Sequence, residues 1–449
     1  MRLTAVILAA GQGTRMKSAT PKVLHPLAGQ PLVRYAVDTA TQVTGAAPVL
    51  VVGHGGDQVR EALGDRARYV IQAEQLGTGH AVLQARALLA GESDAVLVTY
   101  ADMPLVMEET LRRLVERHAQ GAAALTMLTV VSQDPRGFGR VVRDAAGRVA
   151  AIVEERDCTP EQLAIRELNP SVYCFDAAWL WDNLPCLTPS RKGESYLTDM
   201  VALAVGQGRT VNDSVHEGEI ELMGVSTRVH LAEAEAVIRE RINRHWMEAG
   251  VTLQDPATIY IDATVTIGQD TTILPNTHLQ GQTVIGAGCR IGPGSLIVDC
   301  QIGNNCVVTM SVLEHAVLED ETNIGPFGHL RKGARLCRGA HMGNFGEMKN
   351  STLGPGSKMG HFSYLGDAQI GANVNIGAGT ITCNFDGVHK HATVIDDDVF
   401  IGSDSMLVAP LHIGRGAKTG AGSVVTHDVP AGAVVYGVPA RVKRSAGEE

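Results

Sequence analysis

The back half of this chain places an aliphatic residue at every sixth position. The first run comprises Ile267, Ile273, Leu279, Ile285, Ile291 and Ile297. The spacing returns in two later runs, first through Ile324, Leu330, Leu336, Met342 and Met348, and then through Ile395, Ile401, Leu407 and Ile413. A period of six fits neither a helix nor a simple alternating strand, and it is typical of a parallel β-helix. We therefore expect a rigid prism whose sites lie on its faces or between neighbouring prisms.

The front half of the chain has a different pattern. Residues 1–227 alternate short apolar runs, such as 49–52 and 95–98, with helical patterns such as 32–41 and 81–89. Short apolar runs are typical of buried parallel strands. The alternation predicts a doubly wound, Rossmann-like α/β domain, with ligands at the carboxyl ends of the strands.

A linker and a repeat domain are expected to follow. Residues 228–250 are charged and rich in helix formers, which predicts a helical linker. Residues 251–449 are expected to form the β-helix domain, with a disordered tail after Arg444. Residues 378–394 interrupt the repeat, and a loop inserted in a regular solenoid is usually either functional or a tolerated surface insertion.

Composition narrows the class of protein. The net charge of −10 argues against a nucleic-acid binder, so local Arg and Lys must hold any anionic substrate. The eight Cys form no CxxC pair, which favours neither a zinc site nor a disulfide framework and points to a reducing cytoplasm. The apolar run 3–10 is too short for a convincing signal peptide, and no stretch is long enough to span a bilayer.

A glycine-containing loop follows the first apolar run. Gly11 and Gly13 let backbone amides approach phosphate oxygens, and Arg15 adds a guanidinium suited to a polyphosphate. Met16 occupies the place of the third Gly of a dinucleotide fingerprint, and no Gly-Lys-Ser/Thr follows as in a Walker loop. Taken alone, the segment is better read as a bare tight turn.

Two further residues stand out by position. Asp102 follows the apolar run 95–98, where a carboxylate either binds Mg²⁺ or caps a helix. His361 lies between the inward repeat positions Met359 and Leu365, so its imidazole should project from the prism. Such an imidazole is either a general base for an attacking amine or a solvated surface group.

Several segments act as motifs in combination. In the front half they are residues 8–16, 21–25 and 75–80. In the back half they are residues 330–331, 347–349, 358–366, 373–380, 384–387 and 402–404. Together these motifs resemble one family, the bacterial bifunctional N-acetylglucosamine-1-phosphate uridylyltransferases/glucosamine-1-phosphate acetyltransferases, and the resemblance covers nearly the whole chain.

For the front half, the resemblance implies a nucleotidylyltransferase domain in which a sugar phosphate attacks UTP and releases pyrophosphate. Arg15 and Lys22 would act on the phosphates, and Asp102 would bind Mg²⁺. UTP and the UDP-sugar would be held by Leu8, Ala9, Ala10, Gly11, Lys22, Gln72, Gly77, Thr78, Tyr100, Ala101, Asp102, Gly139, Glu154, Asn169 and Ser226.

For the back half, the resemblance implies a left-handed β-helix that transfers an acetyl group from acetyl-CoA, with His361 as the general base. Glucosamine 1-phosphate would be contacted by Arg331, Lys349, Tyr364, Asn375 and Asn384. The acetyl-CoA side would comprise Ala378, Asn384, Phe385, Ser403, Ala421 and Arg441.

The chain departs from the family pattern at several positions. The family's Tyr-Gly-Asp has Ala101 at its centre here, and the common Asn-Tyr-Asp-Gly has Phe385. The family's second metal ligand is an Asn, and Ser226 takes its place. A hydroxyl can coordinate Mg²⁺ directly or through water, but it has a shorter reach. The family's late CoA-contacting Arg has only Arg441 as a candidate.

The resemblance therefore implies a homotrimer with acetyl-CoA bound between prisms, which makes UDP-N-acetylglucosamine from glucosamine 1-phosphate, acetyl-CoA and UTP in the cytoplasm. Two alternatives remain open. One is a related bifunctional enzyme with a different nucleotide or sugar. The other is a non-enzymatic regulatory subunit that shares both modules, although such a scaffold has no need of Arg15, Lys22, Asp102 and His361.

Overall fold

The structure is a computed structural model that describes residues 1–135, 137–190 and 193–445. Its internal contacts divide the chain into two compact units, Met1–Ile238 and Arg239–Glu449. Of the tail predicted after Arg444, residues 446–449 lie outside the described residues. Among the described residues, no helix combines the length and apolar character that a membrane span requires.

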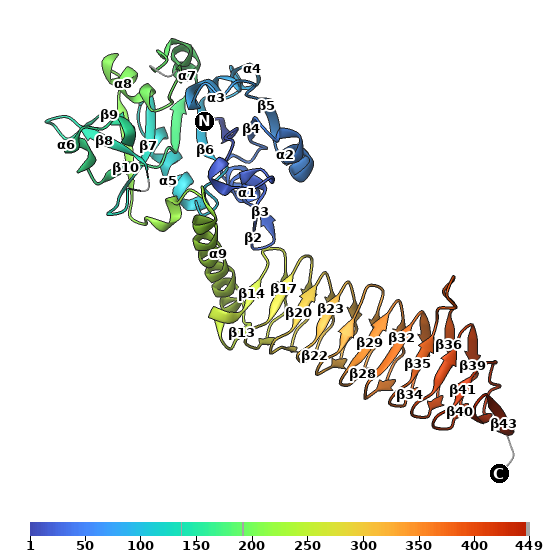
Figure 1. Ribbon diagram of the computed structural model, residues 1–449. Coiled ribbons are helices and arrows are strands. Elements are labelled where there is room, and N and C mark those ends of the chain that lie inside the picture. Colours follow the sequence, from blue (N-terminus) through green and yellow to red (C-terminus); the bar gives the residue numbers. More distant parts are fainter. Residues whose placement is uncertain (136, 191–192, 446–449) are drawn as a thin grey trace. The chain divides into compact units, whose positions relative to one another are not determined.

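The front unit is built on one ten-stranded sheet (Figure 1). The main path runs in the order β5 (Arg68–Ile71), β4 (Val49–Val52), β1 (Leu3–Ala9), β6 (Ala95–Tyr100), β11 (Tyr173–Asp176), β7 (Leu125–Val131), β10 (Glu167–Asn169), β8 (Gly139–Arg143) and β9 (Val149–Val153), and β12 (Val211–His216) pairs with β7. The α-helices of this unit are α1 (Leu32–Thr44), α2 (Gly56–Leu63), α3 (Thr78–Leu83), α4 (Arg86–Leu89), α5 (Glu108–Ala119), α6 (Pro160–Leu163), α7 (Ala177–Asn183) and α8 (Asp199–Gly206).

Short elements complete the front unit. The hairpin strands are β2 (Pro26–Leu27) and β3 (Gln30–Pro31). The 3₁₀ turns are η1 (Thr14–Met16), η2 (Lys22–Leu24), η3 (Gly64–Arg66), η4 (Glu155–Asp157), η5 (Leu184–Cys186) and η6 (Ile220–Leu222).

The sheet is buried on both faces, as expected for a doubly wound fold. In β1, Val6 and Leu8 face one hydrophobic core, while Ala5 and Ile7 face the other. Strands β5, β4, β1 and β6 run parallel, as the apolar runs predicted. Beyond β6 the sheet becomes mixed, because β11 runs antiparallel to both of its neighbours. The predicted helical pattern at 81–89 forms two short helices, α3 and α4, rather than one.

The long helix α9 (Arg228–Glu248) lies in the predicted linker. Its second half closes the first end of the prism, where Ile242 and Trp246 pack against the prism core. The Asn243 side-chain amide donates to the carbonyls of Pro256 and Ile259 at 2.8 and 3.2 Å. The helix therefore covers an edge that would otherwise expose unpaired backbone groups.

The back unit is a parallel β-helix with three faces (Figure 1). The first face comprises β13 (Thr252–Leu253), β16 (Thr272–Ile273), β19 (Arg290–Ile291), β22 (Val307–Val308), β25 (Asn323–Ile324), β28 (His341–Met342), β31 (Lys358–Met359), β34 (Asn375–Ile376), β37 (Phe400–Ile401), β40 (Lys418–Thr419), β42 (Val434–Gly437) and β43 (Ala440–Arg444). Strand β43 returns antiparallel to β42, whereas the other neighbours on this face run parallel.

The second face comprises β14 (Tyr260–Ile261), β17 (His278–Gln280), β20 (Leu296–Val298), β23 (Val312–Glu314), β26 (His329–Leu330), β29 (Gly346–Lys349), β32 (Ser363–Gly366), β35 (Ile381–Cys383), β38 (Met406–Val408) and β41 (Val424–Val425). The third face comprises β15 (Thr266–Ile267), β18 (Val284–Ile285), β21 (Gln301–Ile302), β24 (Val317–Leu318), β27 (Arg335–Leu336), β30 (Thr352–Leu353), β33 (Ala368–Ile370), β36 (Thr393–Ile395) and β39 (Leu411–Ile413). The turn η7 (Pro256–Thr258) precedes β14.

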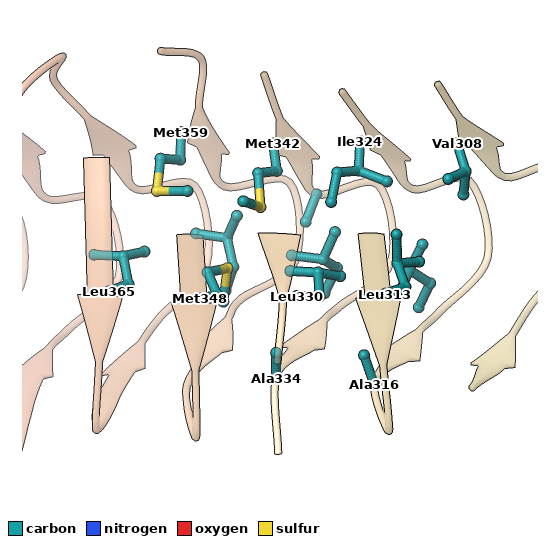
Figure 2. Packing of buried hydrophobic residues seen from close by; sticks show 14 of the residues in the cluster. Val308, Leu313, Ala316, Ile324, Leu330, Ala334, Met342, Met348, Met359 and Leu365 are labelled. Carbon is teal, nitrogen blue, oxygen red and sulfur yellow. The ribbon is translucent and has the colours of Figure 1, made fainter. Parts of the chain in front are cut away.

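The six-residue repeat fills the interior of this prism. Every repeat position predicted from the sequence belongs to its buried core. Figure 2 shows how the side chains stack, with Val308, Ile324 and Met342 in one column and Leu313 and Leu330 in another. Each strand thus contributes its inward residue to a continuous apolar column, and the prediction of a β-helix is confirmed.

The predicted interruption at 378–394 is smaller in the structure. Residues Ile381–Cys383 form β35 and keep the second face continuous. Residues 384–392 form the inserted loop, which is closed by a bridge between Phe385 and Lys390. Both ends of the predicted interruption therefore belong to regular coils of the β-helix, and only its middle forms an inserted loop.

Candidate active sites

A cavity of about 360 Å³ opens at the carboxyl ends of β1 and β6 in the front unit. Its walls include ten residues that the resemblance assigned to nucleotide binding: Leu8, Ala9, Ala10, Gly11, Lys22, Gln72, Gly77, Thr78, Tyr100 and Asp102. Ala101 does not line this cavity. It is fully buried, and its amide donates to the Leu8 carbonyl at 3.0 Å, which ties the ends of β1 and β6 together.

Backbone and side-chain hydrogen bonds fix the wall of this cavity. The Gln72 side-chain amide donates to the Gly77 carbonyl at 3.0 Å, and the Gln75 amide donates to the Ala10 carbonyl at 2.7 Å. Gly77 has a φ of 96°, and a Cβ there would lie 2.5 Å from the Ser195 carbonyl oxygen. A side chain at position 77 would therefore push the 193–197 segment away from the cavity.

Lys22 contacts Asp102 directly. Its Nζ forms an ion pair with Oδ2 of Asp102, and both side chains are largely buried. Gly13, with a φ of 63°, makes this possible, because a Cβ at position 13 would lie 2.5 Å from the Lys22 Cβ. The ammonium and the carboxylate therefore neutralise each other at the end of β6.

A second cavity, of about 210 Å³, shares Asp102 and Tyr100 with the first. Arg15, Ser226 and His230 also line it. The Val225 amide donates to the Asp102 carbonyl at 2.7 Å, which holds Ser226 beside the end of β6. The structure thus brings both predicted metal ligands to one cavity.

The predicted sugar residues lie further along the mixed half of the sheet. Asn169 and Gly139 pair in register between β10 and β8. The buried Asn169 amide donates to the Tyr173 hydroxyl at 2.7 Å. Glu154 accepts a hydrogen bond from the Thr198 hydroxyl at 3.0 Å, and burial raises the pKa of its carboxyl above the ordinary 4.5. Glu154 lines a third, open cavity with Gly137 and Arg140.

Sequence reasoning missed several residues at these cavities. Glu194 and Tyr196 line the first cavity, although they lie more than a hundred residues from the glycine loop. They are brought there because the Ser195 amide donates to the Leu76 carbonyl at 2.8 Å. Gln75 was part of a quoted motif without a role, and His230 was read only as part of a charged helix.

In the back unit, His361 lies on a corner between the first and second faces. The same corner carries Ala378, Ser403 and Ala421 on the next three coils, each in the turn after a first-face strand. Hydrogen bonds join these turns from coil to coil. The Gly379 amide donates to the Phe362 carbonyl at 2.7 Å, and the Gly422 amide donates to the Ser403 carbonyl at 2.8 Å. The predicted base and three predicted acetyl-CoA residues therefore form one ladder.

The second face carries a cationic group at the ends of its strands. Arg331 donates to Glu347 at 2.9 Å, and both side chains remain about 40% exposed, at 41% and 38%. The pKa of Lys349 is lowered, chiefly by the positive charge of Lys390 and then by that of Arg331. Lys390, from the inserted loop, was not singled out from the sequence. Because these three cations repel one another, an anionic group such as a phosphate would bind favourably between them.

Tyr364 and Asn384 meet above Gly366. A Cβ on Gly366 would lie 2.5 Å from the Tyr364 hydroxyl and 2.7 Å from the Asn384 amide nitrogen. The Asn384 amide also donates to the Asp367 carboxylate at 2.5 Å. The absence of a side chain at position 366 thus lets these two polar groups approach each other next to Lys349.

The remaining predicted residues come from three separate segments. Asn375 projects from the first face, between Lys358 and Phe400. Phe385 is exposed at the start of the inserted loop. Arg441 lies on β43, paired with Tyr436, and Tyr436 packs against the Gly420 corner next to Ala421.

Both units of the chain match models of known protein families. A family model for MobA-like NTP transferase domains matches residues 5–200. Models for bacterial transferase hexapeptides (six repeats) and for the hexapeptide repeat of succinyl-transferases match residues 264–298 and 392–427. The bifunctional protein GlmU of Heliobacterium modesticaldum is 51% identical over 96% of this chain and 94% of its own length.

Two further relatives carry the same name. The bifunctional protein GlmU of Pelobacter propionicus is 47% identical over 98% of this chain and 97% of its own length. The bifunctional protein GlmU of a Geobacillus species is 46% identical over 96% of this chain and 94% of its own length. This chain belongs to the bifunctional GlmU family. The predicted family, the left-handed β-helix and the pair of transferase activities are thereby confirmed.

Family membership favours an enzyme over a regulatory scaffold, and it implies nucleotide and acetyl-CoA substrates and a divalent metal. The second cavity fits such an ion. Asp102 supplies a carboxylate and Ser226 a hydroxyl, while the His230 Nδ1 is buried without a hydrogen-bond partner among the described residues. No group of three or more His, Cys, Asp or Glu suited to a metal occurs within the described residues. Nucleotide phosphates would therefore supply much of the coordination.

Proposed function

We propose that this protein makes UDP-N-acetylglucosamine in two steps at two separate sites. The back unit acetylates glucosamine 1-phosphate with acetyl-CoA, and the front unit transfers a uridylyl group from UTP to the product. The observation that carries the proposal is that each unit has its own set of reactive groups. One set lines the cavity around Asp102, and the other lies on the prism, with His361 on a corner and the cations on the second face.

In the acetylation step, the sugar amine attacks the thioester carbonyl of acetyl-CoA, and the CoA thiolate leaves. The exposed imidazole of His361 takes the proton from the amine. The cations Arg331, Lys349 and Lys390 would hold the phosphate of the sugar, while Tyr364 and Asn384 would orient the ring. The corner residues Ala378, Ser403 and Ala421 are small and leave room for the CoA chain along the ladder.

In the uridylyl step, a phosphate oxygen of N-acetylglucosamine 1-phosphate attacks the α-phosphorus of UTP in line, and pyrophosphate leaves. The glycine loop and Gln72 would hold the nucleotide in the first cavity. Arg15 and Lys22 would neutralise charge that develops on the phosphates. Glu154 and Asn169 would position the sugar, so the reaction proceeds without a covalent protein intermediate.

A divalent metal, with Mg²⁺ as the proposed ion, would be held by Asp102 and Ser226. When bound, it supplies positive charge to the nucleotide phosphates. Lys22 is paired with Asp102 in the structure, and phosphate groups would provide the alternative partner for its ammonium.

The acetyltransferase site is proposed to be completed by a homotrimer. On a single chain, the Arg331 side chain is 41% exposed, and a substrate bound there would remain open to water. The corner that carries His361 also carries Phe327, Phe345 and Phe362, which are 49%, 60% and 56% exposed. Phe327 and Phe345 stack with ring centroids 5.1 Å apart. An exposed aromatic ladder is typical of a protein–protein interface.

The cytoplasm is the proposed location, and it is supported by the cysteines. All eight are free thiols, and several of them are buried. A chain with eight unpaired thiols is suited to a reducing compartment.

A coupled assay tests the proposed function. The protein is incubated with glucosamine 1-phosphate, acetyl-CoA, UTP and Mg²⁺, and UDP-N-acetylglucosamine and pyrophosphate are measured. Replacing UTP with dTTP, or glucosamine 1-phosphate with galactosamine 1-phosphate, tests the alternative of a different nucleotide or sugar. The proposal predicts full turnover only with UTP and glucosamine 1-phosphate. Comparable turnover with either substitute would contradict it.

A further inference from the structure

His230 lies in the first turn of α9. Its amide donates to the Thr227 hydroxyl at 3.2 Å, so the helix begins directly after the segment that contains Ser226. Its side chain lines the same 210 Å³ cavity as Asp102 and Ser226. Helix α9 thus presents an imidazole to the cavity where the metal is proposed to bind.

The imidazole has an unused nitrogen. The His230 Nδ1 is inaccessible to solvent and has no hydrogen-bond partner among the described residues. A buried polar atom without a partner costs stability. The ring that carries this unsatisfied nitrogen lines the cavity, so binding of a ligand to the ring would offset part of that cost.

Ser226 leaves a gap that His230 can fill. The family's Asn would place an amide oxygen at the metal, whereas the Ser226 hydroxyl has a shorter reach. Asp102 supplies the carboxylate, and its carbonyl oxygen accepts the Val225 amide hydrogen bond, so both sides of the cavity are fixed. Among the other side chains that line this cavity, the Ser171 hydroxyl already accepts a hydrogen bond from the Asn169 amide at 3.3 Å, and the His230 imidazole is the strongest metal ligand that remains.

Other groups at the cavity are less suited to this role. Arg15 is permanently cationic, and Tyr100 is buried, with its pKa raised well above the ordinary 10. Neither would coordinate a cation at neutral pH, whereas a neutral imidazole is a common metal ligand.

We propose that His230 is a ligand of the divalent metal in this chain, taking up the role that Ser226 only partly fills. The proposal rests on the proposed function, because the metal is the one proposed there for uridylyl transfer. Mg²⁺ prefers oxygen ligands, whereas Mn²⁺ and Co²⁺ bind imidazole more readily. The site should therefore favour Mn²⁺ over Mg²⁺ more strongly than a site with only oxygen ligands.

Pulsed electron paramagnetic resonance of bound Mn²⁺ tests the ligand directly. Mn²⁺ is added to the full-length protein with UTP and without sugar phosphate, and ¹⁴N modulation from a coordinated imidazole is recorded. We expect modulation in the wild type and in the control His245→Gln, which alters an exposed His of the same helix. We expect its loss in His230→Gln, together with a rise in the Mn²⁺ dissociation constant of about tenfold or more.

A second variant tests whether His230→Gln loses metal affinity only because the substitution disturbs the structure. Ser226→Asn in the His230→Gln background supplies a longer oxygen ligand, and we expect it to recover metal affinity with a preference shifted toward Mg²⁺. Wild-type Mn²⁺ without ¹⁴N modulation, or modulation that survives His230→Gln, would overturn the proposal. Neither result would bear on the proposed function, because that is tested separately by the turnover of the wild-type protein with Mg²⁺ in the coupled assay.

Discussion

At the scale of single residues, the front unit holds one carboxyl group, that of Glu154, in a buried position that shifts its pKa. Burial raises the pKa of Glu154, with the Thr198 hydroxyl acting in the opposite direction. The folded protein therefore holds a proton on Glu154 more tightly than the unfolded chain does. This group's contribution to stability is present in acid and is lost as pH rises through the raised pKa.

The same shift predicts a pH dependence of sugar binding. Only the carboxylate form of Glu154 accepts hydrogen bonds from sugar hydroxyls at both oxygens. We expect the KM for N-acetylglucosamine 1-phosphate in the uridylyl assay to fall as pH rises above 4.5 through the raised pKa. The measurement is a pH series of KM for the wild type and Glu154→Gln. The variant should have a higher KM that lacks this dependence, and an unchanged pH profile would refute the assigned role.

Sequence reasoning reached some of these residues but not others. Lys22 and Asp102 were found because each belongs to a local motif, and the structure pairs them. Glu194 and Tyr196 were not found, because only a tertiary contact between Ser195 and Leu76 brings them to the cavity. The role proposed for His230 was also beyond local pattern, since in sequence it is one charged residue among many on a helix.

At the scale of elements, the prism was the most predictable part of the molecule. Each inward repeat position is decided by local spacing, so all of the predicted positions reached the core. The mixed half of the front sheet was not predicted. The antiparallel pairing of β11 with β6 and β7 joins segments whose own patterns do not encode strand direction.

The second face offers a test of element packing. Gly366→Ala places a Cβ within 2.5 Å of the Tyr364 hydroxyl and 2.7 Å of the Asn384 amide. We expect both groups to be displaced, so that the KM for glucosamine 1-phosphate rises about tenfold while uridylyl transfer is unchanged. The control is Gly360→Ala, whose Cβ meets nothing within 4 Å. If both variants acetylate with wild-type kinetics, Tyr364 and Asn384 do not form part of the sugar site.

At the scale of the whole molecule, the aromatic ladder bears on assembly. Phe327→Ser combined with Phe345→Ser removes two stacked, exposed rings while leaving His361 in place. We expect the double variant to sediment as a monomer and to lose most acetyltransfer, because the substrate groups are then open to water. Uridylyl transfer should continue.

The control for the ladder is Val394→Ser, which alters an exposed apolar residue on the third face. It should sediment like the wild type. A double variant that remains trimeric would exclude the ladder as the interface, and a fully active monomer would exclude the shared site.

The central claim is that one chain carries two independent active sites. The most direct measurement is a pair of half-reaction assays, acetyltransfer and uridylyl transfer, on wild type, Asp102→Ala and His361→Ala, with folding checked by circular dichroism. We predict that His361→Ala lowers acetyltransfer by about 10²–10⁴-fold and spares uridylyl transfer. Asp102→Ala should abolish uridylyl transfer and spare acetyltransfer. If either substitution abolished both activities in a folded protein, the two-site account would be contradicted.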